Sequence, residues 1–305
     1  MNNIENKLDP NWITGFTDAE GCFSIRFTQN KQHKIGWYIL PVFIINLHIR
    51  DKNILKGMKS FFGCGTIYYY KNKQVISYAV SDINNINKII IPHFERYPLI
   101  TQKFGDYVLW KNIIELMNEK RHLNKEGLKK IVNLKASLNR GLTKKLEICF
   151  PYTIKVKKPI ASLSKNMDYN WIAGFFTGDG CFFIDILKSK SNKIGYTVTL
   201  RIIIGQHSKD EFLINSLINT FKCGYVYKNP TINYVIFIVA KFKDLYHNII
   251  PFFNQHKIEG IKLLDFKDFC KAAELINKKA HLTKEGLKEI QEIKSRMNKA
   301  RYLSL

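Results

Sequence analysis

Two acidic residues with candidate chemistry each precede a glycine at the end of a predicted short helix. Glu20 comes before Gly21, and Asp179 comes before Gly180, an offset of 159 residues (179 − 20). Carboxylates are hard oxygen ligands of the kind that Mg²⁺ and Mn²⁺ prefer, and such ions polarise a phosphodiester and activate water. A single acid at the end of a helix is usually only solvated. It also interacts unfavourably with the helix dipole. Its repetition makes Glu20 and Asp179 candidate metal ligands.

The two acids belong to a repeat that runs through the chain. Residues 12–16, 21–23 and 122–128 recur in closely similar form 159 positions later, and so do Lys103 and Asp106. A constant offset without net insertion indicates two domains of one fold. We expect a first domain over residues 1–150, a linker over residues 151–167 and a second domain over residues 168–305.

Each copy has the pattern of an α+β unit. Asp9, followed by Pro10, and Asp168 are predicted helix N-caps, and the first helix of each copy is expected to stop at the glycine after the acid. The first copy predicts strands over residues 23–28, 36–48, 65–71 and 75–80, and helices near residues 53–61, 104–118 and 124–139. We therefore predict two pseudo-symmetric repeats, each a four-stranded antiparallel sheet with helices on one face and the other face open to a partner.

Small residues lie on one face of the first helix in each copy. Gly15 and Ala19 are four residues apart, and so are Gly174 and Gly178. Because small side chains let two helix backbones approach closely, we expect these helices to pair about a pseudo-twofold axis. Such pairing would bring the two acids together.

The charge balance points to a polyanionic partner. The chain has 48 Lys and Arg residues against 25 Asp and Glu residues, a net charge of +23 and a pI of about 9.7. A membrane partner is not expected, because the longest apolar runs, residues 42–47 and 234–240, are strand-sized. The six cysteines form no C-x-x-C pair and have the pattern of small apolar residues in a reducing compartment. Nucleic acid is the expected partner.

Residues 13–21 (Ile-Thr-Gly-Phe-Thr-Asp-Ala-Glu-Gly) and 172–180 (Ile-Ala-Gly-Phe-Phe-Thr-Gly-Asp-Gly) resemble the LAGLIDADG motif of homing endonucleases. The resemblance covers nearly the whole chain, including residues 98–103 and the closing helices. It implies a monomeric, single-chain enzyme with two motifs, of the kind encoded in mitochondrial group I introns of fungi. Such an enzyme would be mitochondrial and would use Mg²⁺ or Mn²⁺. Its two sheets would form a saddle on a long, non-palindromic double-stranded DNA site, with one strand cut per motif.

The resemblance also implies which residues bind the metal. These would be Glu20 and Asp179, together with the preceding residues Ala19 and Gly178.

Three further residues are implied to be catalytic. Lys103 and Lys262 match basic residues that family members carry near the scissile phosphates, and a solvated lysine is an equally good interpretation. Gln206 resembles the amide with which the family organises water beside the acid. Its counterpart in the first copy is Leu47, with Asn46 adjacent, so the two copies are not expected to be symmetric here.

Other polar residues near the motifs have a structural interpretation. Asp18 corresponds to Thr177 in the second copy, which denies it an essential role. His48 and His207 are expected to be packed or to contact phosphate, because no third ligand is spaced to join either one in a metal site.

Strand alternation predicts which side chains face the DNA. Phe23, Ile25 and Phe27 are expected under the helices, while polar side chains of the other face would read base edges and lysines would hold phosphates. Leu40 and Val42 share the face of Tyr38, so they contact thymine methyls or the alternation is off by one residue there. The residues predicted to contact DNA in the first copy are Ser24, Arg26, Thr28, Lys34, Tyr38, Asn46, Tyr68, Tyr70, Gln74 and Tyr78. Those of the second copy are Asp185, Lys188, Lys190, Lys193, Thr197, Thr199, Arg201, Tyr225, Tyr227 and Asn233.

Three alternative functions remain open at this point. The same fold could bind intron RNA as a maturase, or bind DNA without cutting it, and residues 65–68 (Gly-Thr-Ile-Tyr) weakly resemble the GIY-YIG nucleases. Neither RNA binding nor DNA binding alone requires the two acids, so their presence favours cleavage.

Overall fold

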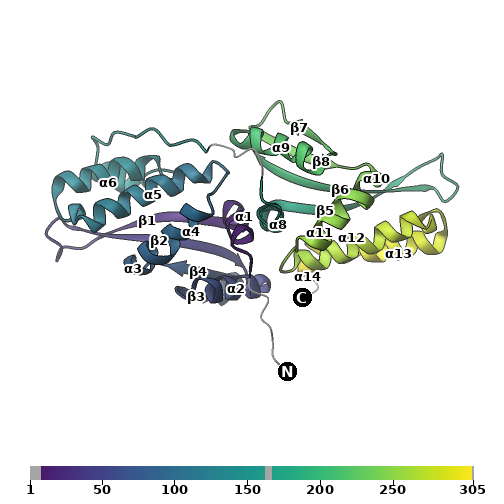
Figure 1. The fold of residues 1–305 in the computed structure, drawn as a ribbon, viewed down its shortest axis with the longest axis horizontal. Coiled ribbons are helices and arrows are strands. Elements are labelled where there is room, and N and C mark those ends of the chain that lie inside the picture. Colours follow the sequence, from purple (N-terminus) through teal and green to yellow (C-terminus); the bar gives the residue numbers. More distant parts are fainter. Residues whose placement is uncertain (1–7, 162–166, 304–305) are drawn as a thin grey trace, which may run out of the picture. The chain divides into compact units, whose positions relative to one another are not determined.

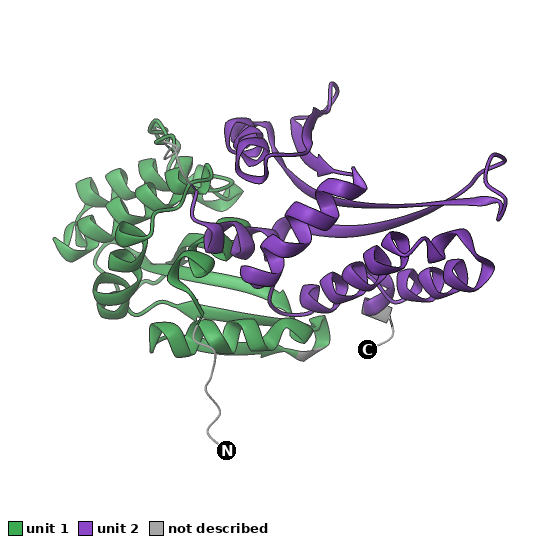
Figure 2. Ribbon diagram, turned by 45° about the vertical axis from the view of Figure 1, so that its right-hand side comes forward, with its two compact units in different colours: residues 1–165 green, residues 166–305 purple. Residues whose placement is uncertain are grey.

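The computed structural model describes residues 8–161 and 167–303 (Figure 1). The chain divides into two compact units, residues 1–165 and 166–305 (Figure 2). Part of the predicted linker, residues 162–166, lies outside the described residues, and its limits stay a prediction. The described part of the chain contains no helix with the length and apolar character needed to cross a membrane.

Each unit holds a four-stranded antiparallel sheet with helices packed on it, as the α+β pattern predicts. The strand order is β1-β2-β4-β3 in the first unit and β5-β6-β8-β7 in the second. The main elements of the first unit are α1 (Pro10–Glu20), β1 (Gly21–Gln29), β2 (Trp37–His48), α2 (Lys52–Phe62), β3 (Thr66–Tyr70), β4 (Val75–Val80), α3 (Ile83–Asn85), α4 (Ile91–Arg96), α5 (Lys103–Asn118), α6 (Lys125–Ser137) and α7 (Lys144–Cys149). Those of the second unit are α8 (Tyr169–Asp179), β5 (Gly180–Lys188), β6 (Tyr196–His207), α9 (Glu211–Phe221), β7 (Tyr225–Lys228), β8 (Tyr234–Val239), α10 (Phe242–Asp244), α11 (Ile250–Gln255), α12 (Lys262–Asn277), α13 (Lys284–Ser295) and α14 (Lys299–Leu303).

The first helix of each unit begins at the predicted N-cap. One carboxylate oxygen of Asp9 accepts the backbone N–H groups of Asn11 at 2.8 Å and Trp12 at 3.2 Å, which satisfies donors that a helix start leaves without partners. Asp168 makes the same two bonds at the same distances.

The first helix of each unit stops at the glycine after the acid, as predicted. Gly21 and Gly180 are extended, with φ of −73° and −79°, so neither forms a left-handed cap. A Cβ atom at Gly21 would lie 2.8 Å from the carbonyl oxygen of Thr17, and one at Gly180 would overlap the ring of Phe176. These glycines therefore allow the strand to leave the helix sharply, directly after the acid.

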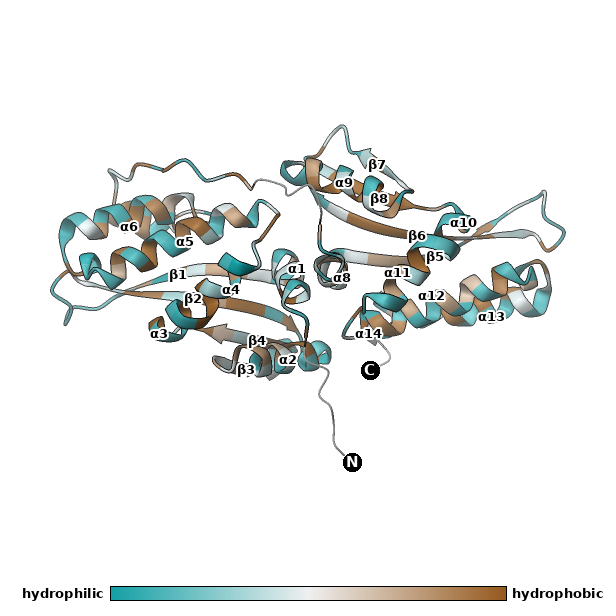
Figure 3. Cartoon of the chain, viewed as in Figure 1, coloured by the Kyte–Doolittle hydropathy of each residue, from teal (hydrophilic) through white to brown (hydrophobic). Residues whose placement is uncertain are grey.

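An aromatic core anchors the start of β1. Phe23 is fully buried, and its ring centroid lies 5.2–5.4 Å from those of Phe43, Phe94, Tyr107 and Trp110. In the second unit Phe182 is equally buried among phenylalanines of α8, α11 and α12. Hydrophobic and hydrophilic residues alternate along α5, α6, α12 and α13, as expected for helices that bury one side (Figure 3).

Several helices gave no clear signal in the sequence. Residues 83–96 form α3, a π-helical turn (Ile86–Ile90) and α4, although this stretch contains the apolar run Ile89–Ile91 and then Pro92. Pro92 has no N–H to donate, and it directly follows the π-helical turn, where the N–H of Ile91 donates to the carbonyl of Ile86 and the regular α-helical hydrogen bonds are already interrupted. The short helices α7 and α14 were also not predicted.

Candidate active site

Each acid is the last residue of the first helix of its unit. Glu20 ends α1 and Asp179 ends α8, and both side chains are half-buried at the start of an edge strand. Partial exposure leaves a carboxylate accessible to a metal ion and a phosphate.

Lys103 and Lys262 lie beside these acids. The ammonium of Lys103 donates to the carbonyl oxygens of Thr17 at 2.9 Å and Ala19 at 3.1 Å. Lys262 donates to those of Phe176 at 3.1 Å and Gly178 at 2.7 Å. A cation at the carbonyl end of a helix is favoured by the helix dipole. Both lysines are thus brought to the predicted site, whereas a freely solvated lysine would make no such paired contacts.

Gln206 contacts the acid of the second unit directly. Its Nε2 donates to Oδ2 of Asp179 at 2.5 Å. Leu47, its counterpart, offers no hydrogen bond, and the adjacent Asn46 instead accepts from the hydroxyl of Ser77 at 2.5 Å. The two units therefore differ at this position: an amide donates to the acid in the second, and a leucine takes its place in the first.

Tyr234 is a residue near the site that sequence reasoning missed. Burial, followed by the negative charge of Asp179, raises the pKa of its hydroxyl. Gly205 makes room for this hydroxyl, because a Cβ atom there would overlap it. The first unit has Asn46 and Val75 at the equivalent positions. In the sequence, only the presence of a glycine and of a tyrosine 29 residues later (234 − 205) could have indicated that Tyr234 lies near Asp179.

Asp18 has the structural role that was predicted. Its carboxylate accepts the backbone N–H groups of Ile100 at 3.0 Å and Thr101 at 3.3 Å, and the hydroxyl of Thr101 at 2.5 Å. These bonds hold the segment that leads into α5, where Lys103 begins the helix. In the second unit Thr177 contacts the backbone N–H of Glu259 at 3.4 Å instead.

The histidines close to the sheet ends cap turns. Nδ1 of His48 accepts the backbone N–H of Arg50 at 3.3 Å and the side-chain Nε–H of the same arginine at 2.8 Å. Nδ1 of His207 accepts the backbone N–H of Lys209 at 3.1 Å. Among the described residues no three His, Cys, Asp or Glu side chains gather as a metal site. One carboxylate per unit still fits Mg²⁺, which keeps several waters and uses substrate phosphates as ligands.

The strand register confirms the alternation predicted for β1 and β2. Ser24, Arg26 and Thr28 pair with Val42, Leu40 and Tyr38, so all six positions share one face. Phe23 and Ile25 are buried on the opposite face. The apolar side chains of β2 therefore do lie on the open face, although Val42 itself is covered there.

The prediction for Tyr78 is wrong. Tyr78 is fully buried on the helix side, and its hydroxyl donates to the carbonyl of Cys64 at 3.1 Å. Gln74 has a left-handed backbone with φ of 50°, so the alternation restarts at Val75 and the open face carries Ser77 in place of its neighbour. Phe237 is buried in the same way in the second unit. Tyr68 and Tyr70, by contrast, are nearly half exposed on β3.

The predicted DNA-contacting residues of the second unit are largely exposed or half-exposed. Tyr225 and Tyr227 are exposed on β7. Thr199 on β6 and Asn233, directly before β8, are also exposed. Arg201 and Asp185 form an ion pair at 2.8 Å, and Thr197 accepts a hydrogen bond from Asn192 at 2.8 Å. The lysines at the hairpin ends of the two units are exposed: Lys34, Lys188, Lys190 and Lys193.

The LAGLIDADG endonuclease family model matches residues 13–114 and 172–273. The chain belongs to this family. It is 42% identical over 301 residues to "Probable intron-encoded endonuclease 2" of Neurospora crassa, covering 94% of this chain and 65% of that protein. It is 37% identical to "Probable intron-encoded endonuclease 3" of the same fungus, covering 92% of this chain and 52% of the relative. The chain therefore spans about half to two thirds of these curated relatives.

Solved structures show the same fold bound to DNA. The I-SmaMI homing endonuclease bound to cleaved DNA has a TM-score of 0.92 and 41% identity, covering 97% of this chain and 98% of that one. I-SmaMI has also been solved with uncleaved target DNA in the presence of calcium ions (TM-score 0.92, 41% identity, 96% and 99% covered). I-LtrWI bound to target DNA has a TM-score of 0.92 and 38% identity, covering 95% and 98%.

Proposed function

We propose that this protein is a homing endonuclease that hydrolyses both strands of one long, non-palindromic double-stranded DNA site. The main observation behind the proposal is that the first helix of each unit ends in an acid. The carbonyl directly before that acid accepts a hydrogen bond from a lysine, and the sheet that follows has one face without helices. The likeness to I-SmaMI and I-LtrWI, both solved with DNA, supports it. Each unit contributes one carboxylate and cuts one strand.

Glu20 and Asp179 would hold Mg²⁺ or Mn²⁺, since carboxylate oxygens are hard ligands. The carbonyls of Ala19 and Gly178 would join them once the metal displaces the Lys103 and Lys262 ammonium groups, which donate to these carbonyls in this structure. The bound metal would polarise the scissile phosphate and activate water. The lysine ammonium groups, already fixed near the acids, offset the negative charge of the phosphate. Gln206 orients the carboxylate of Asp179 through its 2.5 Å hydrogen bond.

The open sheet faces bind the DNA. Exposed tyrosines and polar side chains of β3 and β7 reach the bases, and the hairpin lysines hold phosphates. With a net charge of +23 and about ten phosphates contacted, the logarithm of the binding constant should fall with the logarithm of salt concentration with a slope of about −9. A flat salt dependence would contradict a mode of binding that clamps the backbone.

The protein is proposed to act as a monomer in mitochondria, where its intron would reside. Its relatives include intron-encoded endonucleases and "Uncharacterized mitochondrial protein RF1" of Saccharomyces cerevisiae. A maturase or a non-cutting DNA-binding protein of the same fold would not need Glu20 and Asp179.

Cleavage of plasmid DNA that carries the uninterrupted host sequence tests the proposed function. With Mg²⁺, supercoiled plasmid should pass through a nicked form to a linear form. Ca²⁺ should support binding with little cutting, because its ligand distances are longer and its geometry is looser. Binding without any cutting in Mg²⁺ or Mn²⁺ would leave only the DNA-binding or RNA-binding functions.

A further inference from the structure

Two asparagines after the closing helices share an unusual backbone conformation. Asn139 follows α6 and Asn298 follows α13, and the two are 159 residues apart (298 − 139), the offset of the repeat. Their φ angles are 52° and 54°. Residues other than glycine are uncommon in this left-handed region, and asparagine is among the few that tolerate it.

Each asparagine side chain holds a backbone carbonyl just beyond an acid. Nδ2 of Asn139 donates to the carbonyl oxygen of Phe23 at 2.7 Å, and Nδ2 of Asn298 donates to that of Phe182 at 2.9 Å. These carbonyls belong to the edge strands β1 and β5, and each lies three residues after the acid of its unit. The phenylalanine side chains are themselves fixed, because both are fully buried in aromatic clusters.

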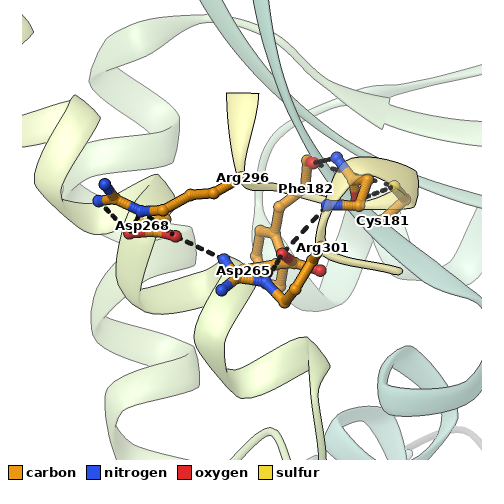
Figure 4. Close-up of polar contacts among 7 residues, drawn as sticks. Cys181, Phe182, Asp265, Asp268, Arg296 and Arg301 are labelled. Atoms are coloured by element: carbon orange, nitrogen blue, oxygen red, sulfur yellow. Dashed lines mark hydrogen bonds and ion pairs between the residues drawn. The ribbon is translucent and has the colours of Figure 1, made fainter. Parts of the chain in front are cut away.

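The backbone of the same asparagine is tied to the helix that carries the lysine. The N–H of Asn139 donates to Oδ1 of Asp106 at 2.6 Å, and the N–H of Asn298 donates to Oδ1 of Asp265 at 3.1 Å. Asp106 lies one turn after Lys103 on α5. Figure 4 shows the corresponding region of the second unit, with Asp265 and Arg301 beside Phe182.

These contacts form a hydrogen-bond network around each acid. Lys103 fixes the carbonyl of Ala19, directly before Glu20, and Asn139 fixes the carbonyl of Phe23, after it. Asp106 joins the lysine and the asparagine through α5. The backbone that carries the acid is therefore held on both sides by groups from the closing helices.

We propose that Asn139 and Asn298 are positioning residues for Glu20 and Asp179, respectively. The inference rests on the proposed function, because it assigns one strand to each unit. A misplacement of about 1 Å costs a reacting group up to about a hundredfold in rate. Loss of one carbonyl contact should therefore slow the cleavage of one strand by about tenfold and leave the other strand unchanged.

Two substitutions separate the side-chain contact from the backbone conformation. Asn139→Asp keeps the size and tolerates the left-handed backbone, but its carboxylate cannot donate to a carbonyl. Asn139→Gly keeps the backbone N–H bond to Asp106 and removes only the amide. Asn298→Asp and Asn298→Gly are the equivalents in the second unit.

Asn124→Ala is the matched control. Asn124 caps α6, where its Oδ1 accepts the N–H of Gly127 at 2.9 Å, so its loss weakens the start of that helix. It lies in the same unit but outside the hydrogen-bond network around the acid. It should lower the unfolding temperature without changing the ratio between the two strand-cleavage rates.

The experiment follows both strands of an end-labelled target, with DNA binding in Ca²⁺ and thermal unfolding measured alongside. The Asn139 variants should slow one strand and the Asn298 variants the other, and each should raise the Mg²⁺ concentration needed for half-maximal cleavage of its strand. Equal slowing of both strands, or wild-type rates in the glycine variants, would overturn the inference. If the aspartate and glycine variants both fail to fold, the asparagines are structural only. Failure of the wild-type protein to cut would instead reject the proposed function, and the inference with it.

Discussion

The two units differ most in the surroundings of their acids and in the polar content of their cores. Asp179 has the amide of Gln206 at 2.5 Å, whereas the first unit has Leu47 at that position. Conversely, the first unit buries His93 where the second has Phe252. The lysine and asparagine contacts beside the acids are nevertheless the same in both. Backbone placement of the acid is thus common to the units, while its chemical environment is not.

The units also close their helices differently. In the first, Asp106 pairs with the half-exposed Lys158, from the segment after α7, at 2.7 Å. In the second, Asp265 pairs with Arg301 of α14 at 2.8 Å, and the same arginine contacts Asp268 (Figure 4). The position equivalent to Asp268 is the buried Leu109. The second unit therefore adds a second buried carboxylate to this ion-pair network, at a position where the first unit has an apolar side chain.

Removal of either acid's charge gives the largest expected effect. Glu20→Gln and Asp179→Asn keep the shape and should each slow one strand by about a hundredfold or more, because a preorganised electrostatic contact to the reacting group is lost. DNA binding in Ca²⁺ should stay close to that of the wild-type protein. Strand-specific cleavage assays would measure this, and a variant that loses both strands equally would show that the acids do not work separately.

Arg301→Ala should destabilise the second unit strongly. The side chains of Asp265 and Asp268 are only 5% and 8% exposed in the folded protein. Asp265 would lose its ion pair, whereas Asp268 would keep its contact with Arg296 at 2.8 Å. Breaking a buried pair in this way typically costs about 3–5 kcal/mol.

Lys158→Ala is the control from the first unit, where the lysine side chain is 34% exposed. This pair is more exposed than those of Arg301, and exposed ion pairs contribute only about 0–1 kcal/mol, so its loss should cost less stability. Urea unfolding of both variants tests the difference, and equal losses of stability would contradict it.

His93 should make the first unit sensitive to acid. Burial lowers the pKa of His93 to about 4. Between that value and the usual pKa of about 6.5, the unfolded chain binds more protons than the folded one, so stability falls as the pH falls, by about 2 kcal/mol from pH 8 to pH 5. His93→Phe, which copies the second unit, should remove most of this loss. His33→Phe, in a hairpin loop, is the control, and an unchanged pH profile in His93→Phe would contradict the assignment.

The repeat, the acids and most strands could be predicted because they depend on local spacing. The burial of Tyr78 could not, because one left-handed residue, Gln74, resets the alternation. The contacts of Lys103 with Ala19 and of Asn139 with Phe23 join residues 84 and 116 positions apart. Hydrophobic periodicity does not encode such long-range hydrogen bonds. The sequence therefore left two interpretations of Lys103 open and gave no prediction for Asn139.

Gln206→Leu gives the smallest expected effect and tests the asymmetry of the acids. The substitution copies Leu47 and removes the donor that contacts Asp179 at 2.5 Å. Loss of a partner that orients a metal-binding residue typically costs at least about tenfold in activity or metal affinity. The strand cut by the second unit should slow accordingly, so that nicked plasmid accumulates before the linear form.

The reciprocal variant, Leu47→Gln, distinguishes orientation from reach. If the amide sets the relative strand rates, a donor beside Glu20 should speed the strand cut by the first unit, and combining both substitutions should reverse the strand preference. Asp179 is also one methylene shorter than Glu20, so Asp179→Glu should change the rates if reach decides. If the strand rates respond only to Asp179→Glu, the length of the acid, and not the Gln206 amide, causes the difference between the two strands.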